Sequence, residues 1–459
     1  MKDFKNNQEK ESRSEAMGKD PVWRLLFHFS GPALISMTVA STYNLVDAIF
    51  VGRLGAGALA AMTVTYPLLL SFIAVASGTA VGVTSLISRR LGAGEKKSAD
   101  MAACVSITLC FILSAVIAFV CLPNIESILV ILGAGDVVLP LATKYTSILI
   151  KFVIFSFLFM ILGSIIRADG NPVFTSSVSV FSSIMNIILD PVFIFGFGPI
   201  PAMGISGAAT ATVIAQAIST IIYLIYILLN KTGYEFRPAY FLPYPKVIAD
   251  IYRIGVASIV RSGVQFLVMG IINRKAAFFG VIPLAVIGIL IRMGRFVQMP
   301  SIGLGQGLLP LIGYNYGARK KERVAELVLK AAISGITWSV LCWTIIMLFP
   351  GLLMNLFNSD PAFLNEGIPA ARIYFICIFI LGVQMIPGFF FQGIGKGLPA
   401  TVLSSARHIF FLLPMVLLLP RLYGLKGLWI SFPIADILTF LLGIFWISME
   451  FRRQGILFR

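Results

Sequence analysis

The chain has 459 residues, of which 58% are hydrophobic and 12% are charged, and its mean hydropathy is +0.93. Soluble globular proteins carry about 25% charged residues, so the composition excludes the soluble classes and indicates an integral membrane protein. The formal net charge of +16 would suit a nucleic-acid-binding protein, but the basic residues are divided among separate connections. We therefore expect no nucleic-acid partner.

The first twenty residues are polar and mixed in charge, which is typical of a short tail. Long apolar runs then follow one another, each near the roughly 20 residues needed to cross a bilayer core. They predict an all-α integral membrane protein with twelve transmembrane helices. These begin near Trp23, Ala58, Ala99, Val138, Pro172, Ser206, Ile251, Ile282, Ala325, Glu366, Pro399 and Gly424.

Lys and Arg gather in alternate connections between these spans. The second connection carries Arg89, Arg90, Lys96 and Lys97, and the eighth carries Arg319, Lys320, Lys321 and Arg323. The N-terminal tail, the sixth connection and the C-terminus are also basic. Because positively charged connections stay in the cytoplasm, we expect a multi-pass protein of the cell (inner) membrane with both termini cytoplasmic.

The two halves of the chain resemble each other. LISRRLGAGEKKSADM, from Leu86, matches LIGYNYGARKKERVAE, from Leu311, at an offset of 225 residues. The same offset superposes Gly78 and Gly82 on Gly303 and Gly307, two GxxxG pairs that let helices approach closely. It also aligns RADGNP with QGIGKG, and with a small gap GISG at Gly204 matches GLKG at Gly424.

This repeat predicts two parallel six-helix repeats around a central cleft. The expected divisions are a cytoplasmic tail (1–22), an N-terminal bundle (23–230), a cytoplasmic linker (231–250), a C-terminal bundle (251–450) and a second tail (451–459).

Three helices of the first half each carry a polar pair spaced by four residues, which places both members on one face. The pairs are Tyr43 with Asp47, Asn186 with Asp190, and Thr212 with Gln216. Charged groups inside spans cost about 2.5–3.5 kcal/mol near a helix centre and usually serve a function. The simpler alternative is that these groups form interhelical hydrogen bonds that only hold the bundle together.

TYNLVDAIFVGRLG, SRRLGAG, RADGNP, NIILDP and GLGQGLLPLIGYNYGA occur in this order. Together they resemble the bacterial drug-efflux branch of the multidrug and toxic compound extrusion (MATE) family, over roughly 23–450. The resemblance implies a secondary antiporter, not an enzyme, that exports lipophilic, often cationic drugs against inward proton or sodium flow. It assigns cation coupling to Asp47, with Tyr43, Asn186, Asp190 and Thr212 around it. Pro32 matches a first-helix proline at which the family's helix bends.

The second half departs from one branch of the family, which also uses carboxylates in its seventh and tenth helices. Here the seventh span has Arg261 and Gln265, and the tenth has no interior acid, so coupling through this half is not expected. The second-half arginines are expected to cap helix ends and pair with Asp436 in preference to forming an anionic substrate site. The residues that we consider for a substrate cleft are Gln216, Arg261, Gln265, Arg292, Met293 and Asp436.

Two acids in one small apolar space cannot both stay ionised cheaply. We therefore favour a proton as the coupling ion, with sodium at Asp47, Asn186, Asp190 and Thr212 as the alternative. Lys144 and Lys151 either reach for the membrane surface or pair with these acids.

The remaining alternatives concern the energy source and the substrate. GIGKG at Gly393 lacks the spacing of a phosphate-binding loop, so ATP is not expected as the fuel, and no cofactor or structural metal is indicated. A flippase for lipid-linked precursors, from the same superfamily, stays as the alternative function. We expect a monomer whose partners are lipophilic small molecules and membrane lipid.

Overall fold

The computed structural model describes residues 15–136, 138–229, 232–357 and 360–455. The predicted tail segments 1–14 and 456–459 and the first linker residue, 231, lie outside this range. The described chain is helical, and within it the only β-type pairing is an isolated bridge between Phe197 and Ile200. It divides into two compact units. Unit 1 contains Ile35–Gly255 and the described residues before Asp20, and unit 2 contains Asp20–Leu34 and Val256–Arg459.

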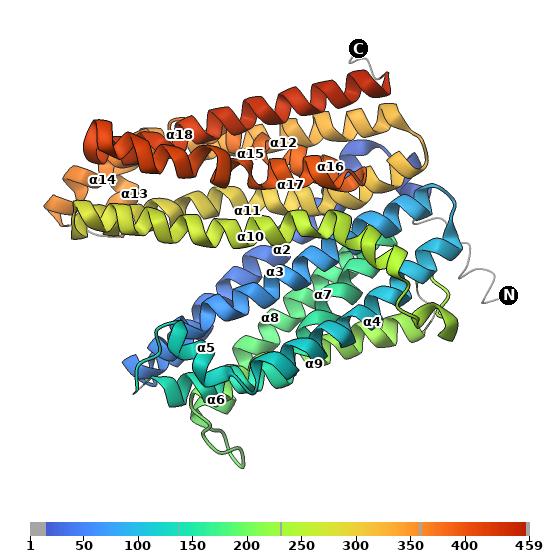
Figure 1. Cartoon of the computed structure of the whole chain (residues 1–459), viewed down its shortest axis with the longest axis horizontal. Helices are drawn as coiled ribbons and strands as arrows, with labels where there is room; N and C mark the ends of the chain where they lie inside the picture. Colours follow the sequence, from blue (N-terminus) through green and yellow to red (C-terminus); the bar gives the residue numbers. More distant parts are fainter. Residues whose placement is uncertain (1–14, 137, 230–231, 358–359, 456–459) are drawn as a thin grey trace. The chain divides into compact units, whose positions relative to one another are not determined.

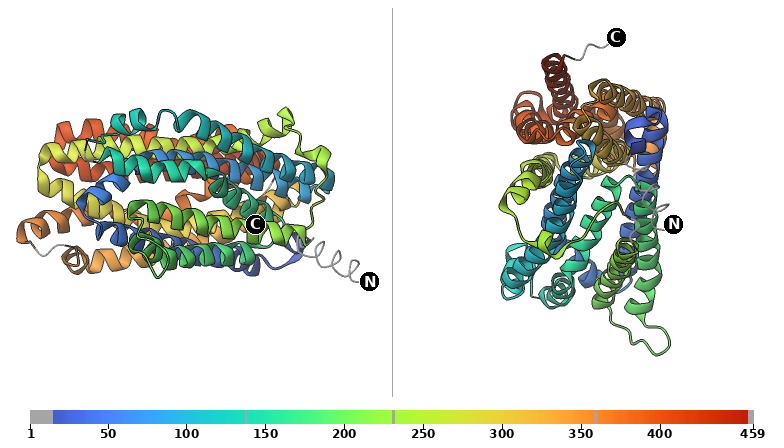
Figure 2. Two further views of the ribbon diagram at one scale, coloured as in Figure 1. Left: turned by 90° about the horizontal axis from the view of Figure 1, so that it is seen from below. Right: turned by 90° about the vertical axis from the view of Figure 1, so that its right-hand side faces the viewer.

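Unit 1 is a bundle in which α7 packs against α3, α4 and α9, and α8 packs against α9. Figures 1 and 2 show these helices running side by side. Its centre is an apolar cluster that includes Ile87, Phe157, Ile161 and Tyr223. The elements are the later part of α2 (Val22–Gly52), α3 (Ala56–Gly92), α4 (Lys96–Cys121), α5 (Ile125–Ile131), α6 (Leu139–Lys151), α7 (Val153–Ala168), α8 (Pro172–Phe195), α9 (Ile205–Leu228), η1 (Pro238–Phe241) and the start of α10 (Pro245–Phe279).

Unit 2 has its own apolar centre, which includes Leu290, Phe375, Trp429 and Phe432. Its elements are the first part of α2, the rest of α10, α11 (Val281–Gly317), α12 (Lys321–Leu348), α13 (Pro350–Asn355), α14 (Pro361–Tyr374), η2 (Ile378–Ile380), α15 (Leu381–Gln384), α16 (Ile386–Gly393), α17 (Gly397–Ala406), η3 (Arg407–Leu412) and α18 (Leu413–Gln454). The η3 segment is a π-helical turn.

The helices reproduce the predicted spans. Among the described residues, nine helical segments are long and apolar enough to cross a membrane. Two bent pairs raise the number to 11, namely α6 with α7 at 47° and α14 with η2–α16 at 45°. The last of the nine segments, Gly397–Gln454, is interrupted at Gly424, whose φ of 56° and ψ of −142° are not helical. Dividing it there gives twelve, which agrees with the predicted number.

The internal repeat is confirmed by the helix bounds. Helix α3 begins and ends 225 residues before α11 begins and ends, and α4 begins 225 residues before α12. The turns also match. Gly55 and Gly280 have φ of 111° and 127°, and Gly170 and Gly395 have φ of 94° and 80°. Gly204 (φ 57°, ψ −135°) has nearly the conformation of Gly424. A positive φ favours glycine because it has no Cβ, so these glycines fix where each helix stops.

The GxxxG pairs let helices approach closely, as predicted. In unit 1 the backbone of Ile251 in α10 lies over Gly82 of α3, and in unit 2 the backbone at Ser30 in α2 lies over Gly307 of α11. A Cβ at either glycine would collide with the partner backbone. The start of α10, which opens the second half of the sequence, therefore packs on α3 of the first half. Likewise, the start of α2, which opens the first half, packs on α11 of the second half. The two units accordingly divide within α2 and α10, and not within the connection 231–250.

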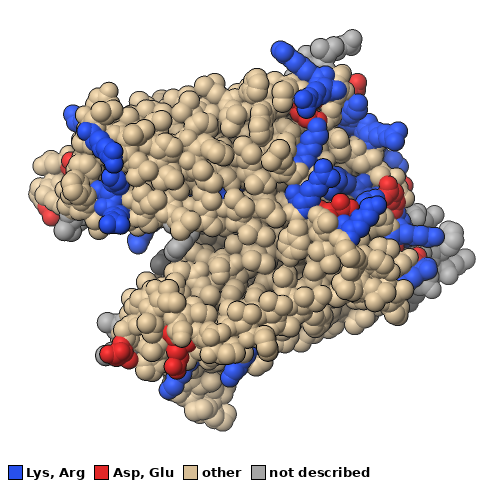
Figure 3. All heavy atoms as spheres, viewed as in Figure 1, with Lys and Arg blue, Asp and Glu red and all other residues tan. Residues whose placement is uncertain are grey.

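Most charged side chains on the surface lie toward the ends of the helices. On the face shown in Figure 3, Lys and Arg gather over the end of each unit that carries the α3–α4 or the α11–α12 connection. A smaller group lies at the opposite end of unit 2. The surface between these ends carries exposed apolar side chains such as Phe111, Phe119 and Phe278. An apolar band between charged ends is what a membrane-spanning bundle presents to lipid.

One turn of the repeat breaks the glycine rule and gives a testable prediction. Arg319 has φ of 57° at the position equivalent to Gly94, whose φ is 76°. This region costs an L-residue about 1 kcal/mol. We expect Arg319→Gly to raise the apparent melting temperature of the purified protein in detergent. We expect Gly94→Ala to lower it, although no atom lies within 4 Å of an added Cβ there.

The matched control is Arg319→Ala, which removes the charge and keeps the backbone cost. A rise in melting temperature as large as that of Arg319→Gly would show that charge, and not backbone conformation, controls stability at this turn.

Candidate cation-coupling site

Two buried acids meet within unit 1. Asp47 comes from the later part of α2 and Asp190 from α8, and their side chains are 4% and 0% exposed. Their carboxylates lie within electrostatic reach of each other. An apolar cluster that includes Val51, Ile194 and Ala209 lies in the same part of the unit. Low polarity strengthens the repulsion between two like charges.

Asn186 and Thr212 hold Asp190 in place. Asn186 lies one turn before Asp190 on α8 and is 3% exposed. In the amide orientation that satisfies both of its ends, its NH2 group donates to Asp190 Oδ2 at 3.3 Å. Its oxygen then accepts from the Thr212 hydroxyl at 3.1 Å and from the Thr212 backbone N–H at 3.2 Å. This chain of hydrogen bonds links α8 to α9 and leaves Asp190 with a fixed amide donor.

Asp47 is less well satisfied. Its Oδ1 atom is buried and has no hydrogen-bond partner within the described part of the chain. A buried carboxylate oxygen without a donor is costly, and this oxygen is free to take up a proton or a cation. Tyr43, one turn earlier on α2, is half-buried. Tyr43 and Asp47 therefore lie one turn apart on α2, and Asp47 is the residue with an oxygen that lacks a hydrogen-bond donor among the described residues.

Tyr145 of α6 completes this site and was not predicted. Its side chain is 4% exposed, and its hydroxyl interacts electrostatically with Asp47, Tyr43 and Asp190. The adjacent Thr146 hydrogen-bonds to Thr65 of α3 at 2.9 Å, which fixes α6 beside the site. In the sequence, the only indication of this role is a tyrosine within a mainly apolar span, next to Lys144.

The other polar residues of the first half lie elsewhere. Gln216 accepts a hydrogen bond from Ser156 of α7, so it joins α7 to α9. Lys144 and Lys151 are exposed, and within the described residues neither forms an ion pair with an acid. Both lysines therefore lie on the outside of the bundle, the first of the two alternatives considered for them.

In unit 2 Asp436 is paired with an arginine, as predicted. Arg407 Nε donates to Asp436 Oδ1 at 2.5 Å, and the two side chains are 15% and 4% exposed. Tyr374 lies within electrostatic reach of this pair, and Gln384 donates to the Asp436 backbone carbonyl at 3.3 Å. Asp436 is thus neutralised by its own bundle.

The remaining residues considered for a substrate cleft lie on α10 and α11 of unit 2. Arg292 and Gln265 are exposed, and Arg261 is half-buried. Met293 packs against the apolar centre of the unit. Arg261 lies within electrostatic reach of His408, so the structure brings only this arginine close to the Arg407 pair.

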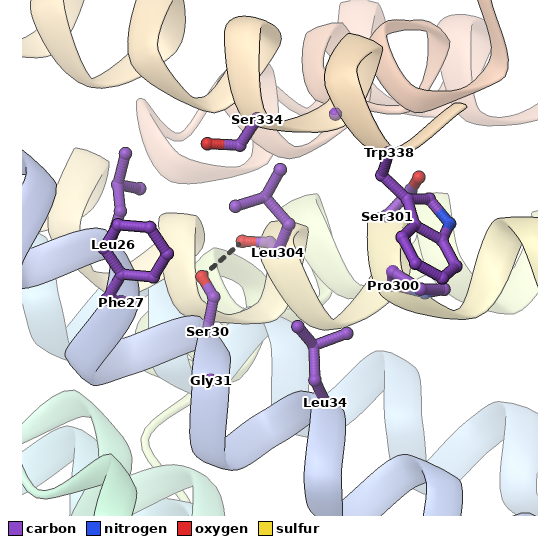
Figure 4. A pocket seen from close by; sticks show the side chains of 11 residues that line it. Leu26, Phe27, Ser30, Gly31, Leu34, Pro300, Ser301, Leu304, Ser334 and Trp338 are labelled. Carbon is purple, nitrogen blue, oxygen red and sulfur yellow. Dashed lines mark hydrogen bonds between the residues drawn. The ribbon is translucent and has the colours of Figure 1, made fainter. Parts of the chain in front are cut away.

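A cavity of about 160 Å³ lies beside the first segment of α2 in unit 2. It is lined by α2 from Leu26 to Leu34 and by residues of α11 and α12 that include Leu304 and Trp338. Figure 4 shows the Ser30 hydroxyl pointing to the Leu304 carbonyl, to which it donates at 3.4 Å. Pro32, the predicted bend, lies in this segment, two residues before α2 passes into unit 1.

These features describe an all-helical membrane protein with two buried acids in unit 1. The MatE family model matches residues 32–192 and 254–417, and the chain belongs to this family of multidrug and toxic compound extrusion transporters. The family is one of transporters and not of enzymes, which agrees with the expectation from the sequence.

Individual relatives are similar along almost the whole chain. A Staphylococcus aureus protein named "Multidrug export protein MepA" is 28% identical over 421 residues, which cover 91% of this chain and 92% of the relative. A solved MATE structure in the bent conformation is 27% identical, with a TM-score of 0.89 over 98% of both chains. A MATE structure in the straight conformation is 26% identical, with a TM-score of 0.89 over 96% of this chain and 98% of that one.

The Arg407–Asp436 pair makes a prediction about stability. Asp436→Asn leaves a buried guanidinium without its counter-charge, which typically costs about 3–5 kcal/mol of stability. We expect a large fall in the apparent melting temperature of the purified protein. Glu322→Gln, at an exposed acid of α12, should change it little. The double variant Arg407→Met with Asp436→Leu should recover most of the loss, because an apolar pair replaces the ion pair. A double variant no more stable than Asp436→Asn would show that the unpaired charge of Arg407 is not the cause of the lost stability.

Proposed function

We propose that this protein is a secondary antiporter that exports lipophilic, mainly cationic drugs or toxic compounds, driven by inward proton flow through Asp47 and Asp190. The observation that carries the proposal is the shared burial of these two acids, one of which has an oxygen without a donor. The name of the staphylococcal relative, a multidrug export protein, supports the same class of substrate. Apolar walls with a buried acid suit lipophilic cations.

The hydrogen bonds of Asn186 favour a proton over sodium as the coupling ion. Its NH2 group faces Asp190, and its oxygen is already occupied by Thr212. A sodium ion at Asp47, Asn186, Asp190 and Thr212 would need that oxygen and would face the amide N–H groups instead. A proton on either carboxylate needs no such rearrangement, and it removes the repulsion between the two acids. Sodium is the alternative that requires Asn186 to turn.

The step from proton uptake to transport goes through α2. Asp47 is on the part of α2 that belongs to unit 1, and Pro32 is on the part that belongs to unit 2. Proline lacks the N–H that would hydrogen-bond to the preceding turn, so the helix is weakest there. Protonation of Asp47 removes its repulsion from Asp190 and so changes how the later part of α2 packs in unit 1. A bend near Pro32 then releases the ligand. Bent and straight conformations are known for solved relatives.

The alternative function is a flippase for lipid-linked precursors, which are anionic. The second-half arginines, Arg261 above all, are the observation that favours it, because an anionic head group needs cations. The acids of unit 1 have no obvious use in that reaction, so we rank antiport first. In either case the expected setting is the cell membrane, with a monomer acting without ATP.

The coupling role of Asp47 is tested in proteoliposomes with separately imposed pH and sodium gradients. Asp47→Asn copies the shape of the protonated acid but cannot release the proton. We expect wild-type protein to drive efflux of a cationic dye when the pH gradient is applied, and the variant to lose gradient-driven efflux by at least tenfold. Asp100→Asn makes the same change at another buried acid of unit 1 and should keep coupled efflux.

Two outcomes would count against this mechanism. Coupled efflux at the wild-type rate in Asp47→Asn would leave the acid a structural residue. Wild-type protein that moves no dye under either gradient, but translocates a lipid-linked precursor, would establish the flippase instead.

The orientation in the membrane is tested by labelling single introduced cysteines. We expect Lys97→Cys and Arg319→Cys to react with a membrane-impermeant maleimide only from the cytoplasmic side, and Asp136→Cys only from outside. The unmodified chain is the blank, since four of its five cysteines are buried. Labelling of Lys97→Cys or Arg319→Cys from outside would reverse the proposed topology.

A further inference from the structure

Arg261 carries a charge that nothing in its own unit neutralises. It lies at the middle of α10 and is half-buried. Within the described part of the chain, no acid forms an ion pair with it and no hydrogen bond satisfies its guanidinium. A charged side chain inside a span is costly and usually has a partner or a function. The described residues therefore leave this guanidinium open to a partner that is not part of the chain.

Its neighbours differ from it in this respect. Arg407 has Asp436 and Tyr374, so this pair is neutral as a group. His408 lies within electrostatic reach of both Arg261 and Arg407. The Nδ1 atom of His408 is buried and has no hydrogen-bond partner among the described residues. Two arginines and one aspartate therefore leave one positive charge and one open imidazole nitrogen in the same region.

The backbone at this point is also unusual. Arg407 and His408 begin η3, a π-helical turn at Arg407–Leu412. The residues 225 positions earlier, Ser182 to Ile187, lie in the regular helix α8. Such π-turns are rare and occur mainly at functional sites. The repeat has been altered here, on the helix that corresponds to the one carrying Asp190 in unit 1.

We propose that Arg261 is the centre of an oxyanion-binding site in unit 2 that takes the carboxylate of an amphipathic transported molecule. The guanidinium fork binds a carboxylate through two parallel hydrogen bonds. Gln265, one turn further along α10, is exposed and offers an amide N–H on the same face. The inference rests on the proposed function only in that the ligand is a transported molecule.

The charge balance selects the kind of anion. One uncompensated guanidinium matches one negative charge, which a carboxylate supplies. A phosphate dianion would bring a second charge, and Arg407, the other arginine that acts on His408 among the described residues, is already paired with Asp436. The substrate class is therefore amphipathic molecules that carry a single carboxylate.

The test is binding of dansylglycine and of its uncharged methyl ester to the purified full chain in phosphatidylcholine nanodiscs, without any ion gradient. We expect the wild-type protein to bind the acid at least tenfold more tightly than the ester. Arg261→Gln should bring the ratio of the two affinities close to one. Arg261→Lys, which keeps the charge but loses the fork, should give an intermediate ratio. Arg295→Gln, at an exposed arginine of α11, should keep the wild-type ratio.

Competition on the wild-type protein tests the site without any variant. Benzoate should displace dansylglycine, whereas benzylamine at the same concentration should not. An acid-to-ester ratio near one in wild type, a ratio unchanged by Arg261→Gln, or an equal loss in Arg295→Gln would overturn the proposal. Loss of wild-type dansylglycine binding in phosphatidylglycerol nanodiscs would assign the site to a lipid phosphate and overturn the substrate assignment. Because no gradient is used, a failure of the coupling test on Asp47 leaves this result unaffected, and the reverse also holds.

Discussion

A charge inside a membrane span must find a partner, because leaving it alone costs about 2.5–3.5 kcal/mol on the insertion scale. This chain meets that constraint in three ways. Asp47 and Asp190 are placed together, so that either can be relieved by a cation. Arg407 and Asp436 neutralise each other permanently. Arg261 has neither solution within the described chain. The first arrangement is suited to a charge that changes during a cycle, and the second to one that does not. The third is suited to a charge that meets a ligand.

The scaffold that presents these groups is one six-helix pattern used twice, yet the two copies carry opposite chemistry. At the repeat offset Asp47 corresponds to Ile272 and Asp190 to Met415, so the second copy has lost both acids. In the last span, aligned through Gly204 and Gly424, Gln216 corresponds to Asp436. The backbone turns have been kept while the polar side chains have diverged. Turns are kept because a changed glycine would misplace a whole helix, whereas a polar residue on an inner face can change with the ligand that it meets.

The sequence predicted what local chemistry determines. Spans follow from apolar length, the repeat follows from glycine spacing, and the four-residue spacing of Asn186 and Asp190 was sufficient to place both residues on one face of their helix. The sequence did not predict Tyr145, because its role depends on how α6 packs against α2 and α8, and a single tyrosine has no spacing pattern. It also did not predict the π-turn at Arg407, since one extra residue per turn leaves no compositional mark. The sequence also did not predict that the first segment of α10 packs on α3 and the first segment of α2 packs on α11. A GxxxG pair allows close packing but does not specify which helix packs against it.

The division of α2 between the two units is the basis of its role in the proposed mechanism. A single continuous helix belongs to unit 2 before Leu34 and to unit 1 after it. Its first segment packs against the Gly307 face of α11, where a side chain larger than hydrogen would not fit. Its later segment carries Asp47, whose buried carboxylate lies within electrostatic reach of Asp190. In the mechanism that we propose, a change at Asp47 acts on a helix whose other end is fixed by steric contact, and the helix bends where its hydrogen bonding is weakest, at Pro32. Under the proposed mechanism, proton uptake needs no separate signalling path, because the coupling acid and the fixed end are parts of one helix.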